Sequence, residues 1–267
     1  MSVDDRAFTF GDGVYDVCEV NGGALIEETR HLDSLDRSLK AVRIGWPVGR
    51  EALRVVMREV VRRNRVRDGL VYLQISRGAA RRDHGFPPEG VRPGLVVSAR
   101  ALDPSVGAAR AAAGVAVVTV PETRWAHPHI KTLQLMPNVL AKQAAREAHA
   151  FEAWFVDRDG FVTEGASTNA WIVTPGGELA TRRADDSILH GVTRAALIDL
   201  ADAHGLALVE RPFTVEEAMG AREAFFSSAT MLATPVVTID GAPIGDGRPG
   251  SVTLALRRVF RERAERS

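Results

Sequence analysis

A change in composition near residue 105 most constrains the fold, because it separates two stretches that each carry their own strands and helices. Residues 102–107 contain Asp-Pro-Ser, and residues 108–113 are mostly alanine. Proline and small polar residues between two periodic segments are typical of a linker. We therefore predict a linker here, with a smaller domain over residues 1–103 and a larger one over residues 108–267.

The first stretch has the pattern of a small sheet with two helices. Residues 14–20 are rich in β-formers and lead through Asn-Gly-Gly at residues 21–23 into an apolar run, which predicts a β-hairpin. Apolar side chains recur at helical spacing over residues 31–42 and 50–64. Two further strands are predicted over residues 71–76 and 94–99.

The second stretch alternates in the same way. We predict strands over residues 115–120, 152–156, 170–173 and 224–226. We predict helices over residues 138–149, 193–204 and 251–265, and Gly205 is expected just past the end of the second. Both stretches mix strands and helices without an internal repeat, so the predicted class is α+β.

The charge balance excludes several kinds of partner. The 34 Lys and Arg residues equal the 34 Asp and Glu residues, so no overall field attracts nucleic acid or an anionic membrane. The most apolar run, residues 111–120, is too short to span a bilayer. Cys18 is the only cysteine and is expected in the core, and no signal-peptide pattern opens the chain. We expect a cytoplasmic protein that acts on small molecules.

Lysine is scarce, which narrows the choice for chemistry that needs a primary amine. Only Lys40, Lys131 and Lys142 are present among the 34 basic residues. Lys40 and Lys142 lie on polar sides of predicted helices. Lys131 lies in a mainly apolar segment, where loss of solvation lowers the pKa of an amine and favours its use as a nucleophile or base. From its position alone, a surface lysine is the simpler interpretation.

Three polar segments have compositions that suit an anionic ligand. Residues 162–169 place Glu164 among glycine and hydroxyl residues before a strand, where backbone amides and the carboxylate can hold a ligand. Residues 191–193 begin a helix whose first N–H groups attract anions. Residues 226–230 add three hydroxyls. Taken singly, a polar turn or an ordinary helix cap explains each segment.

A loop rich in glycine, proline and arginine at residues 77–93 contains Arg82 and His84. A guanidinium beside an imidazole can bind a carboxylate, although solvated surface charge is the simpler interpretation in so arginine-rich a chain. The two imidazoles of His127 and His129 lack a cysteine or carboxylate at metal-ligand spacing. We therefore predict no metal site.

Taken in order along the chain, the short motifs resemble those of fold-type IV pyridoxal-phosphate enzymes. The matching motifs are Phe10-Gly11-Asp12-Gly13-Val14-Tyr15-Asp16-Val17, Ile130-Lys131, Thr163-Glu164-Gly165, Gly191-Val192-Thr193-Arg194 and Ser228-Ala229-Thr230. The resemblance spans residues 6 to about 258. Within this class the chain most resembles the D-amino-acid transaminases, because Arg82-Asp83-His84 is similar to their Arg-x-His carboxylate trap.

The resemblance implies a two-domain α+β fold with pyridoxal 5′-phosphate in the cleft between the domains. It implies a Schiff base between Lys131 and the cofactor aldehyde, with Glu164 beside the pyridine nitrogen. The phosphate is expected to bind Val192, Thr193, Ser228, Ala229 and Thr230. The substrate is expected near Tyr15, with its α-carboxylate held by Arg82 and His84 across the interface of a homodimer.

Two departures from the family pattern accompany the resemblance. The family pattern His-x-x-Arg-Leu reads His31-Leu32-Asp33-Ser34-Leu35 here, so Ser34 replaces the arginine expected on the cofactor phosphate. Arg37 would substitute only if its helix were rotated or shifted, and we predict weak cofactor retention. The chain also has only nine residues before Phe10, where relatives have an additional strand pair. Either the small domain lacks an edge or the start codon is misassigned.

The predicted reaction is a ping-pong transfer of an amino group from a D-amino acid to a 2-oxo acid such as 2-oxoglutarate or pyruvate. The first alternative is an aminodeoxychorismate lyase, or a branched-chain or (R)-amine transaminase, of the same fold. The second is a cofactor-free binding scaffold that has lost catalysis. Lys131, Glu164 and the Arg82 and His84 pair argue against a scaffold, which needs none of them.

Overall fold

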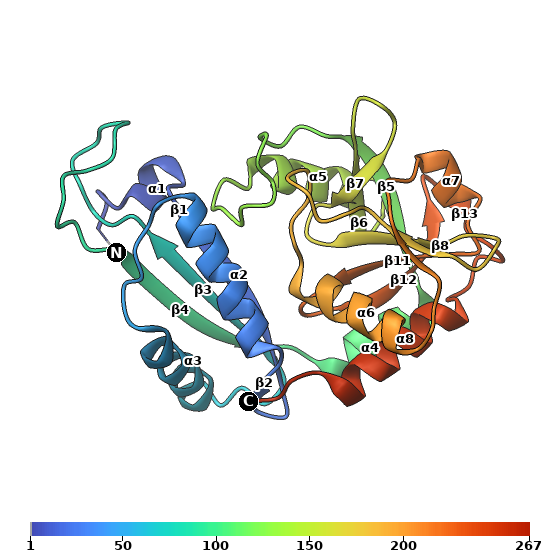
Figure 1. Cartoon of the computed structure of the whole chain (residues 1–267), viewed down its shortest axis with the longest axis horizontal. Helices are drawn as coiled ribbons and strands as arrows, with labels where there is room; N and C mark the ends of the chain where they lie inside the picture. The colour runs from blue at the N-terminus through green and yellow to red at the C-terminus, as the bar shows by residue number, and fades with distance from the viewer. Residues whose placement is uncertain (1) are drawn as a thin grey trace. The chain divides into compact units, whose positions relative to one another are not determined.

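The computed structural model describes residues 2–267 and divides into two compact units (Figure 1). Unit 1 holds the chain up to Asp103 together with Ile130–Leu135 and Glu265–Ser267. Unit 2 holds Pro104–His129 and Met136–Ala264. The main change of unit occurs where the composition of the sequence changes.

Unit 1 is built on an antiparallel sheet in the order β2-β1-β3-β4. Its strands are β1 (Gly13–Asn21), β2 (Ala24–Leu25), β3 (Gly69–Ser76) and β4 (Gly94–Ala101), and its helices are α1 (Arg6–Phe10), α2 (Glu28–Ala41) and α3 (Arg50–Arg63). Gly22 and Gly23 both have positive φ in the β1–β2 turn, which confirms the predicted hairpin. The other strands and helices predicted for this stretch are also present.

One face of this sheet packs against α2 and α3. The core there consists mainly of Val14, Cys18, Leu32, Leu35, Leu39, Leu53, Met57, Val61, Val71, Leu73 and Ile75. Because strand side chains alternate between the two faces, Tyr15, Tyr72 and Gln74 lie on the opposite face. Cys18 is fully buried, as predicted, and burial raises the pKa of its thiol well above the ordinary value.

Unit 2 is built on a mixed sheet in the order β10-β9-β8-β11-β12-β5-β6-β7, and β13 pairs with β12. Its strands are β5 (Val115–Pro121), β6 (Glu152–Val156), β7 (Val162–Gly165), β8 (Asn169–Val173), β9 (Leu179–Thr181), β10 (Leu208–Glu210), β11 (Glu223–Ser228), β12 (Leu232–Ile239) and β13 (Ala242–Pro243). Its helices are α4 (Pro104–Ala113), α5 (Met136–Glu147), α6 (Val192–Ala203), α7 (Val215–Met219) and α8 (Ser251–Arg263).

The predicted strands and long helices of unit 2 are present, and Gly205 follows α6 with φ +66° as expected. The short strands β7, β9, β10 and β13 were not predicted, because two to four residues show no clear period. Strand β12 was also missed. It contains Pro235, and its pairing with β5 begins only at Val236, so the missing N–H leaves no gap in that ladder.

The predicted linker is wrong, because its residues form a helix. Residues 104–113 fold as α4 (Pro104–Ala113) and begin unit 2. Proline is favoured at the first helical position and alanine has the highest helix propensity. The same residue types therefore allow both interpretations, and the packing of unit 2 selects the helix. No helix within residues 2–267 is both long and apolar enough to cross a membrane.

Candidate active site

Lys131 lies on a short segment that extends the sheet of unit 1. The backbone N–H of Tyr15 donates to the carbonyl of Lys131 (3.0 Å), and that of Leu133 donates to the carbonyl of Gly13 (3.1 Å). The segment thus runs antiparallel along β1. We expected Lys131 in the domain over residues 108–267, but Ile130–Leu135 groups with unit 1. The reason is pairing between residues far apart in the sequence, which local patterns do not reveal.

The side chain of Lys131 lies beside aromatic residues of unit 1. Its Nζ is 4.4 Å from the ring centroid of Tyr15, which stacks on Tyr72 with centroids 5.8 Å apart. The backbone N–H of Lys131 donates to Oγ of Ser38 (3.3 Å). Burial raises the pKa of Tyr72, whose hydroxyl donates to Oε1 of Gln74 (2.8 Å). The structure brings together Lys131 and Tyr15, and it adds Tyr72 beside them.

Helix α2 places Ser34 on the same face as Ser38, one turn earlier. Ser34 and Ser38 are both buried, whereas Arg37 is exposed. Because Ser38 contacts the Lys131 backbone, this register leaves the side chain of Arg37 in solvent. The helix is therefore not rotated to put Arg37 in the place of Ser34.

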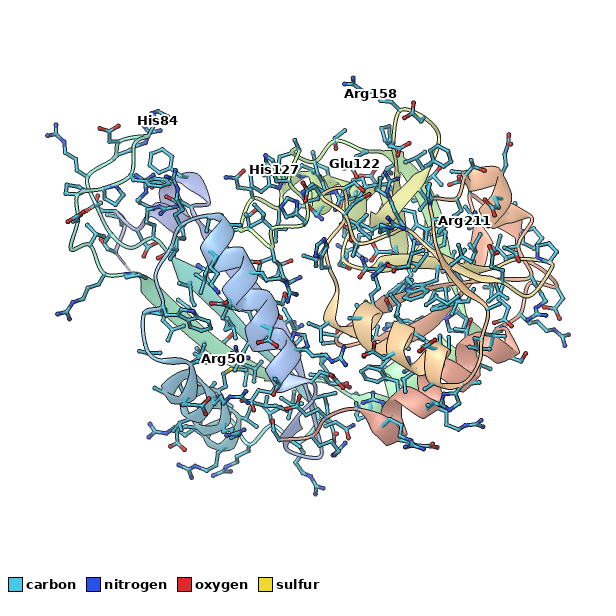
Figure 2. The ribbon with its side chains drawn as sticks, in the orientation of Figure 1. Arg50, His84, Glu122, His127, Arg158 and Arg211 are labelled. Carbon is cyan, nitrogen blue, oxygen red and sulfur yellow. The ribbon has the colours of Figure 1, made fainter. Side chains whose placement is uncertain are left out.

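Arg82 and His84 lie on the long loop between β3 and β4, and both are exposed (Figure 2). The Arg82 guanidinium carbon is 5.1 Å from the ring centroid of Phe10, and the His84 ring centroid is 5.4 Å from it. Arg6 is buried, lies 4.8 Å from the same ring, and donates to the carbonyl of Asp83 (2.6 Å). The loop is thus attached to α1 while its two predicted carboxylate ligands stay accessible.

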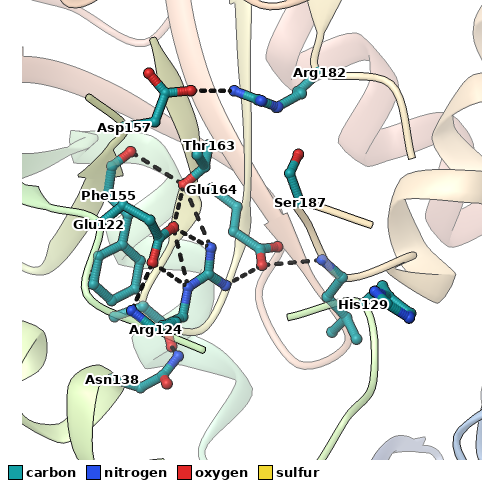
Figure 3. Close-up of polar contacts among 12 residues, drawn as sticks. Glu122, Arg124, His129, Asn138, Phe155, Asp157, Thr163, Glu164, Arg182 and Ser187 are labelled. Carbon is teal, nitrogen blue, oxygen red and sulfur yellow. Dashed lines mark hydrogen bonds and ion pairs between the residues drawn. The ribbon is translucent and has the colours of Figure 1, made fainter. Parts of the chain in front are cut away.

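Glu164 lies on β7 in unit 2 and is 3% exposed. Its carboxylate accepts hydrogen bonds from Nδ2 of Asn169 (2.9 Å) and from the backbone N–H of Leu189 (3.0 Å). It also forms an ion pair with the guanidinium of Arg124 (Figure 3). These contacts fix the orientation of the carboxylate and favour its charged form.

Arg124 lies between two carboxylates. It donates to Oε2 of Glu122 (2.5 Å), pairs with Glu164, and lies 4.7 Å from the ring centroid of Phe155. Burial raises the pKa of Glu122, but hydrogen bonds and charge from Arg124 outweigh it and hold the pKa below its ordinary value. Burial lowers the pKa of Arg124, but the charge of Glu164 and contacts with Glu122 raise it overall. All three groups are therefore charged.

Asn169 connects Glu164 to the start of α6. Its Nδ2 also donates to the carbonyl of Leu189 (3.0 Å), and a Cβ at Gly191 would lie 2.1 Å from its Oδ1. A larger residue at Gly191 would displace this amide. Gly191 precedes α6 without a side-chain cap. The first N–H groups of α6 have no carbonyl partner within the helix, and they belong to Val192 and Thr193.

The end of β11 lies beside the same asparagine, because Ser227 and Asn169 are cross-strand partners. Ser228 follows, and its buried Oγ has no hydrogen-bond partner among residues 2–267. Ala229 and Thr230 continue into the turn before β12. An unpaired buried hydroxyl needs a partner, and the helix start near it attracts anions. Unit 2 thus brings the residues predicted for the phosphate to one end of its sheet.

A sequence model of the family described as Amino-transferase class IV matches residues 13–239. The chain belongs to the class IV aminotransferases. This membership confirms the family predicted from the ordered motifs.

This class IV aminotransferase is similar to D-alanine aminotransferases over nearly its whole length. It is 34% identical to one from Staphylococcus aureus (strain MSSA476) over 265 residues, which are 99% of this chain and 93% of that one. It is 35% identical to one from Listeria monocytogenes serotype 1/2a (strain 10403S) over 272 residues, which cover 100% of this chain and 92% of that one.

The fold is that of solved class IV structures. A branched-chain amino acid aminotransferase from T.th. with pyridoxamine 5′-phosphate matches with a TM-score of 0.89 and 27% identity, and the match covers 98% of this chain and 88% of that one. The branched-chain enzyme from Escherichia coli gives 0.88 and 25% over the same shares. The predicted α+β fold of the fold-type IV enzymes is therefore confirmed.

Class IV aminotransferases use pyridoxal 5′-phosphate, and the residues of this chain fit that cofactor. The unpaired Ser228 hydroxyl and the uncapped start of α6 suit a phosphate. The buried Glu164 carboxylate suits a protonated ring nitrogen. Unit 1 supplies an amine, Lys131. Residues 2–267 contain no group of three His, Cys, Asp or Glu side chains arranged to hold a metal ion.

Sequence reasoning missed Arg124 and Glu122, as well as the contact of Ser38 with Lys131. Arg124 is one of 31 arginines, counted as 34 basic residues less three lysines, and its spacing does not distinguish it from the others. The sequence signal was its place a few residues before Lys131. Only the burial of Arg124 between two carboxylates separates it from the surface arginines.

Proposed function

We propose that this class IV aminotransferase transfers the amino group of a D-amino acid to a 2-oxo acid by a ping-pong reaction. The observation that carries the proposal is the loop on which Arg82 and His84 approach the ring of Phe10 and remain exposed. A guanidinium and an imidazole together suit a substrate α-carboxylate. Identity of 34–35% to D-alanine aminotransferases supports this substrate class over the branched-chain enzymes at 25–27%.

In this proposal Lys131 binds the cofactor and moves a proton at the substrate α-carbon. Bound pyridoxal phosphate supplies a ring that accepts electrons from that carbon. Glu164 holds the ring nitrogen in its protonated form, and Tyr15 donates a hydrogen bond near the substrate carboxylate. The residues that hold the phosphate are Val192, Thr193, Ser228, Ala229 and Thr230.

Single half-reactions test the substrate class. The protein is loaded with pyridoxal phosphate and mixed separately with D-alanine, L-leucine and (R)-1-phenylethylamine while the cofactor absorbance is followed. We expect D-alanine to convert the cofactor and the other two compounds to leave it unchanged. The Lys131→Ala variant is the control and should show no conversion.

A response to L-leucine alone would overturn the D-amino-acid proposal in favour of a branched-chain aminotransferase. A response to the amine alone would favour an (R)-amine transaminase, and release of pyruvate from aminodeoxychorismate without conversion of D-alanine would favour a lyase. Absence of any cofactor absorbance in the wild-type protein would favour the binding scaffold.

The proposed working form is a homodimer. Helix α5 exposes three large apolar side chains at helical spacing: Met136 (66%), Val139 (57%) and Leu140 (62%). A contiguous exposed apolar face is typical of a contact surface, and a second copy of the chain is the occupant we propose. Sedimentation should show a dimer that Leu140→Glu dissociates, whereas Val55→Glu on the exposed side of α3 should leave it intact.

A further inference from the structure

Glu122, Arg124 and Glu164 form a buried cluster of two carboxylates and one guanidinium (Figure 3). The side chains are 20%, 7% and 4% exposed in that order. The hydrogen bonds from Thr163 to Glu122, and from Asn169 and Leu189 to Glu164, come from neutral donors. The cluster therefore has one net negative charge in a site from which water is largely excluded.

We propose that Arg124 is a positioning residue, which holds Glu164 in place and leaves this cluster with a single negative charge for the protonated ring nitrogen of bound pyridoxal phosphate. This inference rests on the proposed function, because it takes Glu164 as the group at that nitrogen. Arg124 acts through Glu164 rather than on the substrate.

The geometry divides the two carboxylate oxygens of Glu164 between different donors. Arg124 and the backbone N–H of Leu189 both bind Oε1, whereas Asn169 binds Oε2. The planar guanidinium is itself fixed by Glu122 on its other side and by the ring of Phe155. The position of Glu164 is thus set by contacts from several segments of unit 2, and Arg124 supplies the only charged one among these three donors.

The charge of Arg124 matters as much as its position. Without it, Glu122 and Glu164 would be two carboxylates in one buried site, and such a pair takes up a proton. Glu164 is the more buried of the two, so desolvation favours its protonation over that of Glu122. A neutral carboxylic acid would no longer balance a cationic ring nitrogen.

The test compares pyridoxal phosphate with its 1-deaza analogue, in which C–H replaces the ring nitrogen. Dissociation constants for both are measured at neutral pH on the wild-type protein and on Arg124→Gln. We expect Arg124→Gln to weaken pyridoxal phosphate binding by about tenfold or more and to leave binding of the analogue nearly unchanged. Arg182→Gln, which removes an ion pair with Asp157 in the same unit (2.9 Å), is the matched control and should affect neither.

A double variant separates charge from shape. In Glu122→Gln/Arg124→Gln, Glu164 is the only acidic group left in the cluster, so the single negative charge returns and part of the affinity for pyridoxal phosphate should return with it. Arg124→Lys keeps the charge but not the planar fork, and its smaller loss should again be confined to pyridoxal phosphate. These two variants also keep the test open if Arg124→Gln does not fold.

Equal losses for both cofactors, or no loss for either, would overturn the role of Arg124. A folded double variant that binds no better than a folded Arg124→Gln would overturn the charge argument. Failure of the proposed function gives a different result, because the wild-type protein would then not bind pyridoxal phosphate or not react with D-alanine.

Discussion

The carbonyl of Gly13 accepts a hydrogen bond from the backbone N–H of Leu133 at 3.1 Å, and this contact holds the Lys131 segment against β1. A Cβ at Gly13 would lie 2.7 Å from Cδ1 of Leu133 and 2.6 Å from the carbonyl oxygen of Ile75. The second glycine of the Phe-Gly-Asp-Gly motif is therefore required by packing, because two neighbouring segments approach its backbone too closely for a side chain.

We expect Gly13→Ala to lower the free energy of unfolding by about 1–3 kcal/mol, because the added methyl group must displace backbone. The Lys131 segment should shift with it, so cofactor binding should fall as well. Urea denaturation and the absorbance of bound pyridoxal phosphate measure the two effects. Gly45→Ala is the control, since no atom lies within 4 Å of its Cβ position. Wild-type stability in Gly13→Ala would contradict this packing.

Ser34→Arg should strengthen cofactor binding, because it restores the arginine of the family pattern. One regained charge-assisted hydrogen bond contributes about 1.5–3 kcal/mol, which corresponds to roughly 10- to 150-fold in the dissociation constant. Equilibrium dialysis against pyridoxal phosphate measures the change. Ser98→Arg adds the same charge at an exposed position of unit 1 and should have little effect. Arg37→Ala should also leave affinity unchanged, since Arg37 lies in solvent; a large loss would show that it does replace the missing arginine.

Arg82→Gln should raise KM for D-alanine by about tenfold or more, because a guanidinium contact with the substrate carboxylate is lost. Steady-state kinetics with D-alanine and 2-oxoglutarate give the value. Arg81→Gln changes the adjacent exposed arginine of the same loop and should leave KM close to wild type. If both variants behave alike, general loop charge rather than a specific contact binds the carboxylate.

Asp12 should make unit 1 sensitive to acid. It pairs with Arg6 (2.7 Å) and Arg77 (2.8 Å), and although burial raises its pKa, the hydrogen bonds and charges of the two arginines hold the pKa below its ordinary value of 3.8. The folded-state pKa is therefore lower than the unfolded one. The ion pairs stabilise the fold fully above that ordinary value, and the stabilisation is lost as pH falls through the lower folded value.

Removal of this carboxylate tests the acid sensitivity. Asp12→Asn should cost about 3 kcal/mol at neutral pH, because two buried guanidinium groups lose their partner. Its stability should then change less than that of the wild type as pH falls below about 4. Urea unfolding at a series of pH values measures both, with the exposed Asp159→Asn as control. Parallel pH profiles for wild type and Asp12→Asn would show that another group causes the acid sensitivity.

Local patterns in the sequence were enough for most of the secondary structure and for the family. Helices α2 and α3 follow from apolar spacing that repeats within a few residues, and the β1–β2 hairpin follows from its two glycines. The scarcity of lysine and the order of the motifs indicated Lys131 and Glu164 for the same reason: each signal lies within a short run of residues.

Only the tertiary structure decided where Lys131 belongs and which arginine supports Glu164. Lys131 joins unit 1 through hydrogen bonds to β1, and Arg124 differs from thirty other arginines in being buried between two carboxylates. The alanine-rich run became α4 because unit 2 gave it a surface to pack on. In each case the deciding contact joins residues distant in sequence. Strand pairing, desolvation and burial exist only when the chain has folded, whereas periodicity and turn chemistry are already present in the unfolded sequence.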